Sequence, residues 1–88
     1  MKLEFDRSFE KDYEKLPASI REKVDKALQH LLIDFRHPSL NAKKMKGAAG
    51  RAGIYRAYVD YHHRMTFKII EDAYRMRRVG KHDIERTP

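Results

Sequence analysis

The chain has 88 residues, a formal net charge of +7, 41% hydrophobic and 38% charged residues, and no cysteine. This composition predicts one folded, highly soluble domain over residues 1–88, and it excludes disulfides and thiolate zinc sites. No apolar run approaches the roughly 18 residues of a membrane span, and the N-terminus lacks the apolar core of a signal peptide. We therefore expect a cytoplasmic protein without a membrane partner.

The excess positive charge lies entirely in the second half of the chain. Residues 1–42 carry 8 Lys/Arg and 8 Asp/Glu, whereas residues 43–88 carry 12 Lys/Arg and 5 Asp/Glu. Charge that served only solubility would be spread over both halves. The asymmetry therefore favours a polyanionic partner such as nucleic acid.

The first part of the chain predicts a strand followed by two helices. Residues 2–5 alternate apolar and polar side chains, and residues 8–16 have apolar side chains at helical spacing. Pro17 separates this helix from a second one, in which seven apolar residues between Ile20 and Phe35 form a single stripe. Residues 39–52 predict a basic loop, and its glycines do not form a nucleotide-binding pattern.

Three antiparallel strands follow the loop. Their apolar residues share one face in a register that pairs Ala57 with Met65, Tyr55 with Phe67, Phe67 with Met76, and Ile69 with Tyr74. The other face, which we call the cationic face, then gathers Arg56, Tyr58, Arg64, Thr66, Lys68, Arg75 and Arg77.

The last strand breaks its own alternation. Tyr74 and Met76 face the core, yet the next apolar residue is Val79, an odd number of positions later. A β-bulge near residues 78–80 would return Val79 to the core. The same shift would turn His82 onto the cationic face.

The cationic face predicts chemistry on RNA phosphodiesters. Arginine binds phosphate through two nitrogens and stabilises charge on phosphorus, while tyrosine can stack on an unpaired base. Imidazole transfers protons near neutral pH, and the 2′-hydroxyl of the RNA would be the nucleophile. Such a reaction needs no cofactor and no metal, and the histidines lack the spacing of a metal site. A solvated surface, or an arginine run that docks an acidic partner, fits the same residues, so composition leaves enzyme and binding module open.

The sequence also resembles the RelE/ParE superfamily of toxins from bacterial toxin–antitoxin systems. The resemblance rests on LEFDRSFEKDYEKLP, MKG, GIYRAYVDYHHRMTFKI and RVGKHD, in that order, and covers nearly the whole chain. It implies an α+β fold in which two N-terminal helices pack on one face of a mostly antiparallel four-stranded sheet, in the order β-α-α-β-β-β. For the RelE type it implies cleavage of mRNA on the ribosome and a cognate antitoxin that forms a hetero-oligomer with the toxin.

The resemblance also assigns roles to residues. It implies that Arg64 and Arg56 bind the scissile phosphate and that His82 is the general acid or base. The residues expected to bind RNA are Lys44, Lys46, Tyr58, His63, Arg75, Arg77 and Lys81. The family often has a catalytic tyrosine some six residues beyond the position of His82, where this chain has none, so His82 or His63 would supply the acid–base chemistry.

Two other functions fit the sequence. The leading alternative is a ParE-type inhibitor of DNA gyrase, which has the same fold and no nuclease chemistry. The missing tyrosine slightly favours this alternative, whereas the basic or imidazole residues at three family positions favour the nuclease. The second alternative is a non-catalytic RNA-binding module, which predicts binding that weakens with salt and no cleavage.

Overall fold

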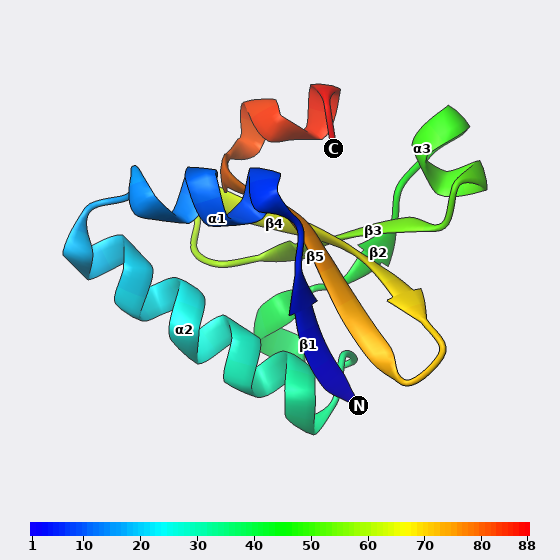
Figure 1. The fold of residues 1–88 in the computed structure, drawn as a ribbon, viewed down its shortest axis with the longest axis horizontal. Coiled ribbons are helices and arrows are strands. Elements are labelled where there is room, and N and C mark those ends of the chain that lie inside the picture. The colour runs from blue at the N-terminus through cyan, green and yellow to red at the C-terminus, as the bar shows by residue number, and fades with distance from the viewer.

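A five-stranded sheet organises the chain in the computed structural model, which describes residues 1–88 (Figure 1). The strands are β1 (Lys2–Phe5), β2 (Lys43–Lys44), β3 (Ile54–Tyr58), β4 (His63–Ile70) and β5 (Ala73–Lys81). The helices are α1 (Arg7–Glu14), α2 (Ala18–Ile33) and α3 (Gly47–Arg51), and two short 3-10 helices are η1 (Pro38–Leu40) and η2 (His82–Arg86). The strand order is β1-β5-β4-β3-β2, and only the β1–β5 pair is parallel.

The α+β class is confirmed, but the prediction of four strands is wrong. The loop expected over residues 39–52 contributes a fifth strand, because β2 pairs with Tyr55 and Arg56 of β3. A strand of two residues is too short to show alternation in the sequence. The same segment contains α3, where a Cβ on Gly50 would lie 1.8 Å from the carbonyl oxygen of Met45, so only glycine fits.

The predicted register of the meander is confirmed. Ala57 lies opposite Met65 and Tyr55 opposite Phe67, and in the next pair Ile69 lies opposite Tyr74. The bulge lies one residue earlier than predicted, because Thr66 pairs with Arg78 while Phe67 pairs with Met76. Arg77 is therefore the extra residue. The expected consequence holds, since Val79 is buried opposite Met65.

The core lies between the sheet and α2. Val24, Ala27, Leu28 and Leu31 of α2 are buried together with the core-facing side chains of the central strands, which are Ala57, Met65, Phe67, Tyr74, Met76 and Val79. Burial of each large apolar side chain contributes about 1.5–3 kcal/mol, which fixes which face of the sheet α2 covers. None of the helices has the length and hydrophobicity that a membrane span requires.

Two other elements bound the opposite, cationic face. Helix α1 runs beside β5 beyond the end of β1, where Asp12 accepts a hydrogen bond from the backbone N–H of Val79 and the Ser8 hydroxyl donates to the carbonyl of Arg77. The 3-10 helix η2, red in Figure 1, packs on β4 and β5. Ile84 is buried there against Gly80. The side chains of Arg56, Tyr58 and Arg64, on β3 and at the start of β4, remain partly exposed on this face.

Candidate active site on the cationic face

Three side chains that the sequence predicted on one face meet at the end of the β3–β4 hairpin. Tyr58 and Arg64 are register partners, and Arg56 precedes Tyr58 by two residues on the same face. The Arg64 guanidinium carbon lies 3.7 Å from the centre of the Tyr58 ring, and that of Arg56 lies 5.3 Å from it. We call these three residues the Arg–Tyr–Arg cluster.

The β3–β4 turn fixes Arg64 in place. Its Nη1 donates to the carbonyl oxygens of Asp60 at 2.7 Å, Tyr61 at 3.1 Å and His63 at 3.0 Å. No carboxylate lies within ion-pair distance of Arg64, and its Nε and Nη2 make no hydrogen bond within the chain. The guanidinium is thus held at one nitrogen while two nitrogens remain available to an anion, the geometry that bidentate phosphate binding uses.

Asp60 organises the turn that holds Arg64. Its carboxylate accepts from the backbone N–H groups of His62 and His63 and from Nδ1 of His63 at 2.9 Å, and it pairs with Lys23 of α2 at 3.3 Å. Burial raises the pKa of Asp60, but these hydrogen bonds outweigh burial and bring the pKa to about 2. His63, the first residue of β4, is buried and its imidazole is bonded to Asp60. In the structure this predicted RNA-binding residue therefore supports the turn.

Arg56 connects the cluster to a cavity lined by lysines. Its Nε lies 3.5 Å from a carboxylate oxygen of Glu85, and its Nη1 is buried without any hydrogen-bond acceptor. A cavity of about 410 Å³ is lined by Lys43, Lys44, Met45, Lys46, Arg56 and Glu85. Four cations and one carboxylate line this space, and a buried N–H without an acceptor is costly. The cavity therefore suits an anionic group.

Tyr58 lies in the electrostatic field of its neighbours. The positive charge of Arg64 is the largest cause of a lowered pKa for the Tyr58 phenol, and hydrogen bonding from the Asn41 side chain adds to it. Burial opposes this shift, and Arg56 contributes further to lowering it. The charges of Arg64 and Arg56 therefore favour the ionised form of the Tyr58 phenol.

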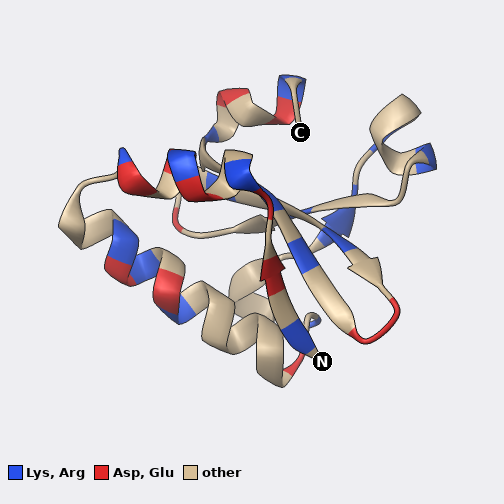
Figure 2. Ribbon diagram, in the orientation of Figure 1, with Lys and Arg blue, Asp and Glu red and all other residues tan.

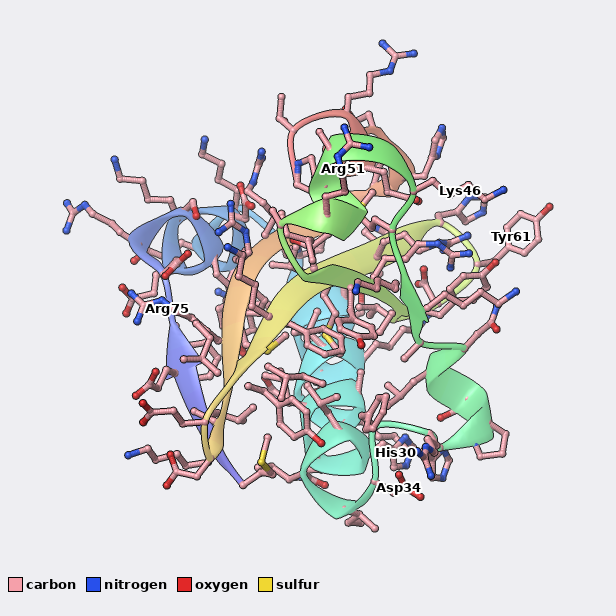
Figure 3. All side chains as sticks on the ribbon, turned by 90° about the vertical axis from the view of Figure 1, so that its right-hand side faces the viewer. His30, Asp34, Lys46, Arg51, Tyr61 and Arg75 are labelled. Atoms are coloured by element: carbon pink, nitrogen blue, oxygen red, sulfur yellow. The ribbon has the colours of Figure 1, made fainter.

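The remaining predicted residues lie apart from the cluster. Arg77 donates from Nε to the carbonyl oxygen of Pro88, which also accepts from Thr66, so residues near the C-terminus cover this part of the face. Arg75 sits near β1, where Asp6 binds its Nε at 2.6 Å. Figure 3 shows Arg75 on the opposite side of the molecule from Lys46. The residues predicted to form one cationic face therefore lie in three places: the Arg–Tyr–Arg cluster, Arg77 near the C-terminus, and Arg75 beside β1.

The end of β5 carries the last two predicted residues. Lys81 is the final residue of β5 and the register partner of His63, and its side chain is exposed. His82 begins η2, so it lies just beyond the strand rather than on it. The His82 side chain is exposed and makes no hydrogen bond within the chain. Its imidazole is therefore open to solvent just beyond the end of β5.

Sequence reasoning missed three residues of the site. Lys43 is the register partner of Arg56 and lines the same cavity, but the two-residue strand that places it has no pattern. Asn41 adopts a left-handed backbone with φ of 43° after η1 and reaches Tyr58. Glu85 is one of the few acidic residues in the second half, and only its position in η2 shows that it faces Arg56.

Figure 2 shows how charge is distributed over these elements. Acidic and basic residues alternate along α1 and the first half of α2, whereas β2 carries basic residues alone (Figure 2). No group of three or more His, Cys, Asp or Glu side chains is arranged to hold a metal ion. The arrangement can bind a phosphodiester and stabilise charge that develops on it.

Solved structures share this architecture. A YoeB/ParE toxin from Agrobacterium tumefaciens superimposes with a TM-score of 0.79 at 20% identity, covering 93% of this chain and 99% of that one. The chain has the fold of the RelE, YoeB and YafQ toxins. The RelB–RelE antitoxin–toxin complex from Methanococcus jannaschii matches with a TM-score of 0.72 at 22% identity over 91% of both chains. The E. coli DinJ–YafQ toxin–antitoxin complex matches at 0.68 and 24% identity, covering 93% of this chain and 92% of that one.

The resemblance read from the sequence is thereby confirmed for the toxin fold. No protein-family model matches the sequence, and neither does any curated protein. At these identities the likeness to the RelE, YoeB and YafQ toxins establishes architecture, and the activity has to be argued from this chain's own residues.

Proposed function

We propose that the protein is the toxin of a toxin–antitoxin system and that it cleaves mRNA on the ribosome by attack of the RNA 2′-hydroxyl on the adjacent phosphate. The Arg–Tyr–Arg cluster carries this proposal, because Arg64 is fixed by the turn and still has two unpaired guanidinium nitrogens. The toxin fold found in RelE, YoeB and YafQ supports the same conclusion.

The cluster suits a reaction whose nucleophile belongs to the substrate. Arg64 would bind the scissile phosphate through Nε and Nη2, and Arg56, which lines the adjoining cavity, would add a second positive charge beside it. Both guanidinium groups would stabilise the additional negative charge of the pentavalent transition state. The protein then has to supply orientation, charge and proton transfer, and no side chain needs to form a bond to phosphorus.

The cavity beside Arg56 would hold the flanking RNA backbone. Lys43, Lys44 and Lys46 provide point charges along about 410 Å³ of space, and lysine contacts with phosphate add affinity without selecting a sequence. The same lysines are the groups that ribosomal RNA would meet first. The Glu85 carboxylate lies 3.5 Å from Nε of Arg56, and a substrate phosphate would compete with it by forming a shorter contact with Arg56.

His82 is the proposed general base. Its imidazole is exposed, free of internal hydrogen bonds and located just beyond the end of β5, two residues after the register partner of Arg64. An imidazole can accept the proton of a 2′-hydroxyl near neutral pH, and loss of such a group typically slows a reaction by about 10²–10⁴-fold. We expect His82→Ala to cleave at this reduced rate and to keep its fold.

A protein antitoxin is the proposed partner. The M. jannaschii and E. coli structures that share the fold are complexes with antitoxins, named RelB and DinJ. By analogy we propose that this chain forms a hetero-oligomer with its own antitoxin. Binding of an antitoxin does not separate a nuclease from a gyrase inhibitor, so it does not by itself test the cleavage reaction.

The decisive experiment is primer extension on a reporter mRNA after brief induction of the toxin. The wild type is compared with His82→Ala, and both proteins are checked for equal accumulation and equal thermal unfolding. New 5′ ends inside translated codons, lost in the variant, support the proposal. Growth arrest with intact mRNA contradicts it and points to gyrase, which a DNA supercoiling assay then tests. RNA binding without arrest or cleavage points to a binding module.

A further inference from the structure

Tyr58 is the only residue of the Arg–Tyr–Arg cluster that can give up a proton. Arginine stays protonated in proteins, so Arg56 and Arg64 supply charge alone. The nearby hydroxyl of Thr66 is buried and donates to the carbonyl oxygen of Pro88. The Tyr58 phenol is half-buried and makes no such bond. Two guanidinium groups that the proposed function assigns to the scissile phosphate lie over its ring.

The groups that face Tyr58 from the surrounding elements are mostly cationic. Arg64 comes from β4, Arg56 from β3 itself, and the Asn41 side chain from the segment after η1. Tyr58 also lines a cavity of about 230 Å³ at the edge of β3, to which α2 contributes Lys23, Lys26 and His30. Two carboxylates lie near the cluster. Glu85 of η2 pairs with Arg56, and Asp60 in the β3–β4 turn binds His62, His63 and Lys23.

This environment favours release of the phenol proton. The pKa of Tyr58 is lowered, first by the charge of Arg64 and then by hydrogen bonding from Asn41. The guanidinium carbon of Arg64 lies 3.7 Å from the centre of the Tyr58 ring, so its positive charge would be close to a phenolate formed in the reaction. The same arginine can thus stabilise the phosphorane as it forms and the phenolate as the proton leaves.

We propose that Tyr58 is the general acid of the cleavage reaction and that its hydroxyl protonates the departing 5′-oxygen. The inference rests on the proposed function. The bond between the 2′-oxygen and phosphorus forms as the bond between phosphorus and the 5′-oxygen breaks. The 2′-hydroxyl proton passes to His82, and the Tyr58 proton passes to the 5′-oxygen. The products are a 2′,3′-cyclic phosphate and a 5′-hydroxyl, and transfer of a proton from His82 through solvent to the phenolate restores the enzyme.

The test uses Tyr58→Phe, which keeps the ring under Arg64 and removes only the hydroxyl. Single-turnover cleavage is measured on ribosomes that hold an mRNA with one mapped cleavage site. The mRNA carries either the normal 5′-oxygen or a bridging 5′-sulfur at that site. Sulfur leaves as a stable anion and does not need a proton. We expect Tyr58→Phe to slow cleavage of the oxygen substrate by about 10²–10⁴-fold and of the sulfur substrate by less than about tenfold.

Two controls separate this role from a structural one. Tyr61→Phe removes a phenol that is 84% exposed at the β3–β4 turn and should cleave both substrates at the wild-type rate. His82→Ala should be slowed on both substrates alike, because a general base acts on the 2′-hydroxyl. Equal thermal unfolding of Tyr58→Phe and wild type verifies the fold.

A second measurement follows the proton itself. A general acid acts while protonated, so cleavage should decline as the pH rises through the pKa of Tyr58. Replacing Tyr58 with 3-fluorotyrosine, whose phenol is more acidic, should move this decline to lower pH. Fluorotyrosine at Tyr61 should leave the profile unchanged.

The outcomes distinguish the inference from the function on which it rests. If the wild type fails to cleave either mRNA, the proposed nuclease function is wrong and the role of Tyr58 is wrong with it. If the wild type cleaves and Tyr58→Phe matches it, or is slowed equally on oxygen and sulfur, Tyr58 is not the general acid while the nuclease assignment stands.

Discussion

The two ends of the cationic face carry the same type of residue in opposite electrostatic states. The bulge brings Arg78 onto this face, opposite Thr66. Near β1 and α1, Arg75 and Arg78 each donate to a carboxylate, at 2.6 Å to Asp6 and 2.7 Å to Asp12. At the β3–β4 end, Arg64 contacts only carbonyl oxygens and a tyrosine ring, and Arg56 has a single carboxylate at 3.5 Å. Of these four arginines, Arg64 alone therefore offers an anionic ligand a guanidinium without a carboxylate partner.

A count of charges along the chain does not show which arginines are neutralised in the folded protein. The first half is neutral as a sequence, yet Asp6 and Asp12 cross the fold to neutralise arginines of the second half. The excess charge of the protein is thereby concentrated on the β2–β3–β4 side. The two ends do not differ in the number of their arginines. They differ in whether a nearby carboxylate neutralises each arginine, as at Arg75 and Arg78, or not, as at Arg64.

Removal of Arg64 should have the largest effect on activity. Arg64→Ala loses the phosphate-binding nitrogens and the charge beside Tyr58, so we expect cleavage in the primer-extension and single-turnover assays to fall by about 10²–10³-fold. Arg64→Lys keeps the charge but loses the planar fork, and should recover only part of this loss. Near-normal cleavage by Arg64→Ala would mean that the reaction takes place elsewhere and that the unpaired arginine does not mark the active end of the cationic face.

Removal of Arg78 should affect stability instead. Its guanidinium binds both carboxylate oxygens of Asp12 and also donates to the carbonyl and hydroxyl of Thr87, and its side chain is 28% exposed. Arg78→Ala should lower the free energy of unfolding by about 1–3 kcal/mol, measured by urea denaturation. Cleavage below the unfolding transition should be unchanged. A variant of normal stability that fails to cleave would show that this end also contacts RNA.

Asp60 should connect the stability of the turn to pH. Its folded pKa of about 2 lies below the ordinary 3.8, so ionised Asp60 stabilises the folded state by about 2 kcal/mol above pH 4. This contribution is lost as the pH falls from about 4 toward 2. The difference in free energy of unfolding between wild type and Asp60→Asn should therefore shrink over that interval. If that difference stays constant with pH, the negative charge of Asp60 does not contribute to the free energy of unfolding.

Much of the fold could be predicted because the spacing of apolar residues in each segment indicates strand or helix, and because only one strand register keeps these residues on the same face. The pairing of Ala57 with Met65 follows from keeping apolar residues on one face, and the odd step to Val79 required a bulge. The exact position of the bulge could not be predicted, because an extra residue at Arg77 or at its neighbour would equally turn Val79 into the core. The strand β2 and helix α3 depend on tertiary contacts, such as that of Gly50 with Met45, which leave no periodic pattern.

The candidate site was predicted where it follows from strand register and missed where it depends on distant segments. Arg56, Tyr58 and Arg64 share a face by parity alone, and the structure brings them together. The alternation also placed Arg75 on this face. It could not show that β1 lies beside β5, which brings Asp6, the residue after β1, to Arg75. A parallel contact between the first and last strands leaves no trace in either segment.

Arg75 should have the smallest effect of the arginines considered. Its side chain is 47% exposed, and an exposed ion pair contributes about 0–1 kcal/mol, so Arg75→Ala should change the free energy of unfolding by no more than that. Cleavage should also be unchanged, because Asp6 and Glu4 already occupy the guanidinium and leave little net charge to attract RNA. Asp6→Asn removes one of these carboxylates. If compensation alone separates the two ends, this variant should bind single-stranded RNA slightly more tightly at low salt, and Arg75→Ala should abolish the gain. A loss of cleavage in Arg75→Ala itself would instead extend the RNA path across the whole sheet.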